Sequence, residues 1–227
     1  MPLLGSAAML LGFDVVPEAM AEHDRWHTHE HLPERLSIPG FLRGTRWCAL
    51  RGAPHYMVLY EVEGLAALTS GAYLQRLNNP TPWTSALMPH YRGMTRGLCT
   101  VLGSFGLGLG HVGALVRFTG GDDVHRWLLS EALPALPLRA GLGSAHLLHG
   151  AAAAAMTCEQ RLRGADGAVD SALLLTGYDV DAVRDAAATT LAPAVLAQRG
   201  AGDVTTALYR ADYSLVSAEL QAARTAR

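Results

Sequence analysis

Four of the ten histidines in this chain of 227 residues lie within nine positions, at 23, 27, 29 and 31. Imidazole titrates near neutral pH and can both take up and return a proton, so such a cluster suits acid/base chemistry. At 100° per residue, a helix would place His23, Trp26, His27, Glu30 and His31 within an arc of about 140°. One face of the predicted helix therefore carries three imidazoles, an indole and a carboxylate.

An internal repeat predicts which way this face points. A shift of 101 residues aligns Arg25-Trp26 with Arg126-Trp127, Glu30 with Glu131, Leu32-Pro33 with Leu133-Pro134, and Gly40 with Gly141. In the second copy the positions of the three histidines are held by Val124, Leu128 and Ala132. Apolar residues at helical spacing indicate a buried stripe. We therefore expect the histidines to face the interior of the first half, where a polar cluster needs partners or a ligand.

Three interpretations of the cluster remain open at this point. In the preferred one, His31 is a general base or acid, His27 or His23 is its relay or substrate clamp, and Glu30 holds the tautomer. In the second, the rings are structural and stack on Trp26. In the third they bind a metal, because His27 and His31 at i, i+4 form a common ligand pair. The His-Glu-x-x-His order of zinc proteases is absent, and we predict no metal.

The other predicted substrate-binding residues are aromatic or basic. Together with the helix residues His23 and Trp26 they are Tyr60, Tyr73, Trp83, His90 and Arg92. Trp83 lies in a double-proline loop that is a candidate lid. His90 and Arg92 are candidates for clamping a carboxylate or phenolate.

The elements that must position these residues follow from the periodicity. In the first half it predicts strands at 7–15, 41–50, 55–62 and 93–103 and helices at 17–33 and 64–77. Residues 104–110 are rich in glycine and are predicted to be a linker. The second half repeats the order with strands near 111–118, 142–149, 171–179 and 204–216 and helices at 122–133 and 181–198. Residues 150–170 are predicted to be a surface insertion.

This order predicts two tandem ferredoxin-like βαββαβ repeats, residues 1–103 and 111–227. Each repeat would form a four-stranded antiparallel sheet with helices on one face. Packing the two open sheet faces against each other buries both. We therefore predict an α+β fold in which the repeats form an intramolecular pseudo-dimeric α+β barrel.

Several spaced motifs of residues 10–100 resemble EthD-like proteins of the dimeric α+β barrel superfamily. They are Trp26-x4-His31-Leu32-Pro33-Glu34-Arg35-Leu36, Pro39-Gly40-Phe41-Leu42, Arg46-Trp47, the run from Gly52 to Glu61, Ala72-Tyr73-Leu74, Asn79-Pro80-Thr81-Pro82-Trp83 and Met88-Pro89-His90-Tyr91-Arg92. The resemblance implies the barrel fold and carries over His31, with Trp26 and Glu30 beside it. It departs at His27, where an aromatic residue is more usual, and at His29, which is usually small or polar. The superfamily includes cofactor-free monooxygenases, lactone isomerases, polyketide cyclases and tandem haem enzymes.

Composition restricts the partners. The net charge is -2 and no block of basic residues occurs, so nucleic acid and membrane are excluded as expected partners. Three scattered cysteines fit reduced thiols in a cytoplasmic protein. The apolar residues 3–11 lack a basic flank and are predicted to be a strand rather than a signal peptide. A homodimer remains open.

These observations predict a cofactor-independent enzyme that acts on a small aromatic or polyketide-like molecule by histidine acid/base chemistry, through cyclisation, isomerisation or elimination. A cofactor-free monooxygenase of phenols is the alternative, and a non-catalytic binding or accessory protein is another. A metal or haem enzyme is a minor alternative. The histidines of the second half, His111, His125, His146 and His149, are scattered, and no set of residues for haem propionates can be recognised.

Overall fold

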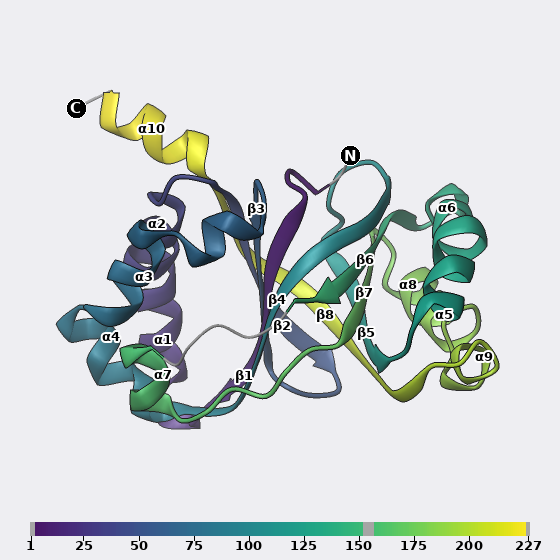
Figure 1. Cartoon of the computed structure of the whole chain (residues 1–227), viewed down its shortest axis with the longest axis horizontal. Helices are drawn as coiled ribbons and strands as arrows, with labels where there is room; N and C mark the ends of the chain where they lie inside the picture. The colour runs from purple at the N-terminus through teal and green to yellow at the C-terminus, as the bar shows by residue number, and fades with distance from the viewer. Residues whose placement is uncertain (1–2, 152–156, 226–227) are drawn as a thin grey trace.

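Eight antiparallel strands form one closed barrel in the order β1-β3-β2-β8-β5-β7-β6-β4. The computed structural model describes residues 3–151 and 157–225. Figure 1 shows one group of helices on each side of the barrel, and most of each group comes from one half of the chain. The predicted α+β barrel built from two βαββαβ units is confirmed.

The first half supplies four strands: β1 (Ala7–Val15), β2 (Phe41–Arg51), β3 (Tyr56–Val62) and β4 (Tyr91–Gly106). Its helical segments are η1 (Pro17–Ala19), α1 (Met20–Trp26), η2 (His27–His31), α2 (Leu32–Leu36), η3 (Leu65–Thr69), α3 (Gly71–Asn78), α4 (Pro82–Leu87) and η4 (Met88–His90). The expected helix at 64–77 is divided at Ser70, whose hydroxyl caps α3 by accepting from the backbone N–H of Tyr73. Strand β4 includes residues 104–106, which had been predicted to belong to the linker.

The second half supplies β5 (Val112–Thr119), β6 (Leu142–Gly150), β7 (Ser171–Gly177) and β8 (Gly202–Val216). Its helical segments are α5 (Asp122–Trp127), η5 (Leu128–Ala132), α6 (Leu133–Ala135), η6 (Leu136–Leu138), α7 (Cys158–Arg163), α8 (Val180–Ala188), α9 (Pro193–Ala197) and α10 (Ser217–Thr225). The predicted helix at 181–198 is thus two helices, because Pro193 begins a new one.

Two strand pairs close the barrel by joining the halves. Within each half the strands follow the ferredoxin-like order, β4-β1-β3-β2 and β8-β5-β7-β6. Strand β2 pairs with β8, and β4 pairs with β6. Each of the eight strands therefore has a neighbour on both sides, which closes the sheet on itself.

The histidine helix contains a widened π-helical turn, and so does its counterpart in the second half. The backbone N–H of Leu32 donates to the carbonyl of His27, and that of Leu133 donates to the carbonyl of Leu128. A proline follows each of these leucines. Because proline has no N–H to donate, the widened turn lets the helix continue where a regular ladder would lose a bond. The helix was predicted to kink or end near Pro33; it runs on to Leu36.

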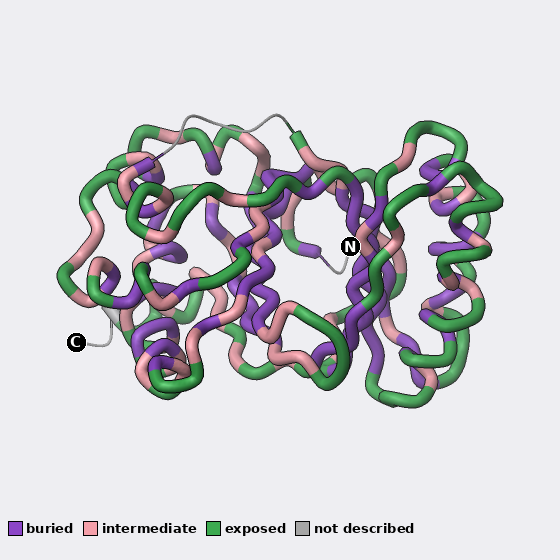
Figure 2. Tube along the Cα trace, turned by 90° about the horizontal axis from the view of Figure 1, so that it is seen from below, coloured by how far each residue is buried: buried purple, intermediate pink, exposed green. Residues whose placement is uncertain are grey.

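Three apolar clusters fill the molecule, and Figure 2 shows their backbone buried along the barrel and on the inner sides of the helices. One cluster lies between helices and sheet in the first half, and a second does so in the other half. The third combines residues of both halves, among them Leu10, Trp47, Leu115 and Leu174, inside the barrel. Alternate strand residues therefore pack on opposite faces of the sheet.

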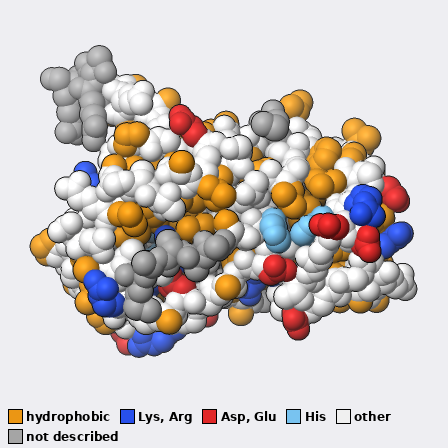
Figure 3. Space-filling view, in the orientation of Figure 1, with side chains coloured by type: hydrophobic (Ala, Val, Ile, Leu, Met, Phe, Trp, Pro, Cys, Tyr) orange, Lys and Arg blue, Asp and Glu red, His pale blue; other side chains and the backbone are white. Residues whose placement is uncertain are grey.

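On the face shown in Figure 3, basic and acidic side chains lie near each other and form no continuous basic surface.

The predicted surface insertion is partly buried, which corrects that expectation. Helix α7 packs against η4 and α3 of the first half, and Figure 1 shows it among the helices of that half. Thr157 caps α7, and both Thr157 and Glu159 are buried. Gly167 then binds the edge of β4 by accepting from Arg96 N (2.9 Å) and donating to the carbonyl of Met94 (2.8 Å). Residues 152–156 of the insertion lie outside the described residues.

Candidate active site

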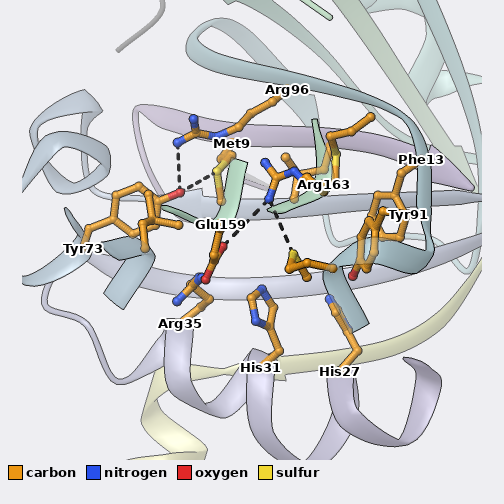
Figure 4. A pocket seen from close by; sticks show the side chains of 14 residues that line it. Met9, Phe13, His27, His31, Arg35, Tyr73, Tyr91, Arg96, Glu159 and Arg163 are labelled. Carbon is orange, nitrogen blue, oxygen red and sulfur yellow. Dashed lines mark hydrogen bonds and ion pairs between the residues drawn. The ribbon is translucent and has the colours of Figure 1, made fainter. Parts of the chain in front are cut away.

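A cavity of about 30 Å³ lies between the histidine helix and the sheet of the first half (Figure 4). Its apolar wall comes from β1, α3, η4 and β4 and consists of Met9, Leu11, Phe13, Leu77, Met88, Tyr91 and Met94. Its polar lining is His27, His31, Arg35, Tyr73, Arg96, Glu159 and Arg163. A cavity of this size holds about one or two water molecules.

Two of the predicted catalytic residues, His27 and His31, line the cavity from the π-helical turn. Their ring centroids are 5.5 Å apart, and the ring of His31 packs 4.3 Å from that of Trp26. The Nε2 atom of His27 lies 3.5 Å from the hydroxyl of Tyr60. The Nδ1 atoms of both histidines are buried and have no hydrogen-bond partner among the described residues. Since buried polar atoms are normally paired, this pair of rings is a candidate site of ligand binding.

Both imidazoles are held in the neutral form. Burial lowers the pKa of His31 well below its ordinary value, and the nearby positive charge of Arg35 lowers it further. Burial likewise lowers the pKa of His27 well below its ordinary value, with smaller contributions from His23, Arg46 and Arg35. A neutral imidazole has a nitrogen lone pair free to take a proton from a bound substrate, which is the state that a general base requires.

Three predicted substrate-binding residues support the histidines without lining the cavity. Trp26 and Tyr60 are fully buried beside them. His23 is also fully buried, packs 4.6 Å from the ring of Tyr56, and pairs with Asp24 at 3.1 Å. Only one of the predicted substrate-binding residues, Tyr73, lies on the cavity itself. Its hydroxyl accepts a hydrogen bond from Arg96 (3.1 Å).

Glu30 is not placed to orient a histidine. Its carboxylate accepts hydrogen bonds from Trp26 Nε1 (3.1 Å), Thr81 Oγ1 (2.6 Å) and, more weakly, Thr84 Oγ1 (3.5 Å). None of these partners is an imidazole, and Glu30 does not line the cavity. It joins the histidine helix to the start of α4.

Trp83, His90 and Arg92 lie outside the cavity. The indole N–H of Trp83 donates to Glu22 (2.9 Å), and its ring lies under the guanidinium of Arg25. The guanidinium of Arg92 is exposed and donates to the carbonyls of Pro89 and Tyr91. The structure therefore does not bring these three residues together with His27 and His31.

Four charged residues of the cavity were missed: Arg35, Arg96, Glu159 and Arg163. The position of Arg35 could have been predicted from the sequence, because it continues the series 23, 27, 31 by four more residues and so lies on the same helix face. Arg96 follows from the face of β4 that also carries Met94. Glu159 and Arg163 belong to α7 of the second half, and nothing in the local sequence predicts that α7 packs on the first half.

The cavity carries more positive than negative charge. Arg35 is 1 % exposed and donates to Glu34 (3.0 Å) and to Glu159 (2.5 Å). Burial alone would lower the pKa of Arg35, but Glu159 and other nearby groups together raise it above its ordinary value. Arg35 therefore stays charged.

The corresponding positions in the second half are apolar. Val124, Leu128 and Ala132 occupy the three histidine positions and are buried in the apolar cluster of that half. The prediction that both stripes face inward is confirmed by their burial, and in the first half this face lines a polar cavity.

Within the described residues, no three His, Cys, Asp or Glu side chains are grouped so as to hold a metal ion. Among the same residues, no helix is long and apolar enough to cross a membrane.

Comparisons with known proteins support the fold. No family profile and no curated protein matches the sequence. An anthrone oxidase-like protein of known structure has a TM-score of 0.63, with 13% identity over 96% of each chain. A protein of Fusobacterium nucleatum, provisionally assigned as a monooxygenase, has a TM-score of 0.60, with 8% identity over 94% of this chain and 95% of its own. A haem-binding protein of Thermus thermophilus has a TM-score of 0.51, with 12% identity over 98% of each chain.

These similarities establish the dimeric α+β barrel fold and leave the narrower resemblance to EthD-like proteins a sequence-based prediction. The cavity of the first half, at about 30 Å³, is smaller than the about 300–1,000 Å³ typical of cofactor pockets, so a haem would not enter it without a rearrangement of its walls. His125 and His149 share the hydroxyl of Ser171, and His146 is bound between Ser104 and Ser144.

Proposed function

We propose that the chain is an enzyme that binds a small aromatic or polyketide-like molecule in the cavity of the first half and transfers a proton through His31, with His27 as its relay, without a cofactor. One observation carries this proposal: two neutral imidazoles with unpaired nitrogens line the same cavity as three guanidinium groups. That combination offers a proton acceptor next to groups that stabilise an oxyanion.

The charges favour removal of a proton from a phenol, or from a carbon next to a carbonyl. Protonation of His31 alone would place a second positive charge close to Arg35, which is unfavourable in a buried site. When the proton comes from the substrate, an enolate or phenolate forms in the same step and its oxygen is stabilised by guanidinium. Return of the proton to a different atom completes an isomerisation, cyclisation or elimination.

A cofactor-free oxygenase is the second candidate. It is favoured by two proteins of the same fold, one described as anthrone oxidase-like and one provisionally assigned as a monooxygenase. The first step would be the same. The carbanion would then react with molecular oxygen, so that an anthrone and one O2 give an anthraquinone and one water.

Hydrogen exchange separates the proton transfer from the oxidation. Two carbon acids, anthrone and 2-tetralone, are incubated with the protein in D2O without oxygen, and loss of the acidic C–H signal is followed by NMR. We expect faster exchange than in buffer for at least one of them, and loss of the acceleration in His31→Ala. His29→Ala, which changes an exposed histidine of the same helix, is the matched control.

Oxygen uptake with the same compounds in air would assign the oxygenase. Exchange without uptake would assign the acid/base enzyme. If His31→Ala accelerates exchange as much as the wild-type protein does, the proposed role of His31 is wrong.

A further inference from the structure

The single acidic side chain among the described residues that line the cavity belongs to the other half of the molecule. Glu159 lies on α7, 124 residues after Arg35, and its carboxylate accepts a hydrogen bond from Arg35 Nη2 (2.5 Å). Glu159 is 3 % exposed. Figure 4 shows it pointing into the pocket from the side opposite His31, next to Arg35. A carboxylate is therefore already bound at the buried guanidinium.

The other two arginines of the cavity differ in their pairing. Arg163 binds Asp166 through two nitrogens (3.1 and 2.9 Å) and lies 3.9 Å from Glu159. Among the described residues, the side-chain hydrogen bond of Arg96 goes to the hydroxyl of Tyr73 (3.1 Å) and not to a carboxylate. The cavity thus holds three guanidinium groups and one carboxylate, and Arg96 adds positive charge that no carboxylate of the cavity neutralises.

The cavity has room for about one or two water molecules, which is too little for an aromatic substrate. Glu159 and Arg163 both come from α7, so displacement of this short helix would enlarge the cavity and free Arg35 at the same time. The outer side of α7 is exposed at Arg161 and Leu162. Its contacts with the first half include the bond from Cys158 N to Asn78 Oδ1 (3.2 Å) and the contact of Arg163 with the sulfur of Met88.

We propose that the substrate of this site is an organic carboxylate, and that Glu159 occupies the position of the substrate carboxylate when no ligand is bound. On binding, the ligand carboxylate replaces Glu159 at Arg35, Glu159 and Arg163 leave the cavity with α7, and Arg96 remains as the guanidinium that stabilises the oxyanion. This inference rests on the proposed function, because it names the substrate class of the same cavity. It also gives the second half a role in the site of the first.

Ligand affinity tests the proposal without any chemistry. Benzoate and its neutral isostere benzamide are titrated calorimetrically into the wild-type protein and into Glu159→Gln, which keeps the size of the side chain and removes its charge. We expect Glu159→Gln to bind benzoate at least about tenfold more tightly than wild type, because the internal competitor is weakened. Benzamide affinity should be the same in both proteins.

Glu34→Gln is the matched control, because Glu34 pairs with the same guanidinium from outside the cavity. It should raise the affinity for benzoate by less than about threefold. The double variant Arg35→Met with Glu159→Gln removes both members of the buried pair and should lose the gain in affinity. The melting temperature of each variant, with and without benzoate, shows whether it folds and whether benzoate stabilises it.

The proposal is overturned if Glu159→Gln does not gain affinity for benzoate, or if benzamide gains as much, since the change would then have added room and not a free cation. Failure of the proposed function looks different. His31→Ala with Glu159→Gln should bind benzoate as tightly as Glu159→Gln alone even when proton exchange is lost. If the wild-type protein catalyses hydrogen exchange but binds benzoate no better than benzamide in any variant, the carboxylate substrate is wrong and the proposed proton transfer still stands.

Discussion

His31 and Ala132 end equivalent π-helical turns on opposite sides of the barrel, and they are 8 % and 6 % exposed. The fold therefore accepts either an imidazole or a methyl group at this position. Since the alanine satisfies the packing in one half, the histidine in the other half is not required for the architecture. The role of each histidine can therefore be tested by replacing it with the residue found at the equivalent position of the second half.

Replacing His31 by alanine should separate activity from stability. Loss of a general base lowers rates by about 10²–10⁴-fold. The free energy of unfolding should change by less than about 2 kcal/mol, because removal of an unpaired buried nitrogen offsets part of the cost of the larger cavity. Urea unfolding and initial rates measure the two effects. If the variant is much less stable and its loss of activity is explained by the smaller amount of folded protein, His31 has a structural role.

The buried histidines should make the protein less stable as the pH falls. His27 and His31 have pKa values well below the ordinary 6.5 in the folded state, so below about pH 6.5 the unfolded chain binds protons that the folded chain does not. Stability is complete above that pH and is lost as the pH falls below it, until the folded-state pKa is reached. Each such histidine contributes up to about 1.4 kcal/mol per pH unit.

The measurement is urea unfolding at pH 7.5, 6.0 and 5.0. His27→Leu with His31→Ala installs the residues of the second half and should flatten the dependence of the free energy of unfolding on pH. A residual slope is expected, since burial also lowers the pKa of His23 and lowers that of His146 to about 3. An unchanged slope in the double variant would mean that the pKa values of the two imidazoles are not lowered in the folded protein.

The sequence was sufficient to predict the barrel and to place two histidines on the cavity that is the candidate site. The repeat predicted that both stripes face inward, and the series of histidines placed His27 and His31 at the cavity. Helical periodicity alone does not distinguish a side chain on the cavity from one packed behind it, so His23 and Trp26 were included in the site. The same periodicity extends to Arg35, which lies one step beyond the last histidine.

The opposite wall of the cavity, formed by α7, could not be predicted from local sequence patterns. Glu159 and Arg163 reach the site because the insertion of the second half packs on the first, and that contact depends on tertiary packing rather than on any periodicity of residues 150–170. His90 and Arg92 were assigned to the site by residue type. The turn of chain before β4 directs the guanidinium of Arg92 to neighbouring carbonyls instead.

Glu30→Ala should cost stability and leave the chemistry intact. The carboxylate accepts hydrogen bonds from Trp26 and Thr81, and its loss leaves the buried indole N–H with Thr84 alone. We expect a loss of about 1–3 kcal/mol in the free energy of unfolding. The rate per folded molecule should stay within about threefold of wild type, since Glu30 does not line the cavity. A rate reduced a hundredfold at unchanged stability would restore Glu30 to the catalytic residues.

Movement of α7 can be prevented by a disulfide. The backbone N–H of Cys158 donates to the side chain of Asn78 (3.2 Å), so Asn78→Cys puts a second thiol beside the start of α7, where oxidation can be used to join it to Cys158. If Glu159 must leave the cavity with α7, the oxidised variant should bind benzoate at least about tenfold more weakly than its reduced form. Dithiothreitol should restore binding, and peptide mapping verifies which cysteines are joined.

The matched control combines Asn78→Cys with Cys158→Ser, which cannot form this cross-link and should bind benzoate equally with and without dithiothreitol. The native Cys48 and Cys99 are present in both proteins, so any effect of their oxidation appears in the control as well. Unchanged binding in a fully cross-linked protein would show that the ligand enters while α7 stays on α3. In that case Glu159 would be a fixed partner of Arg35, and the carboxylate would have to bind at Arg96 alone.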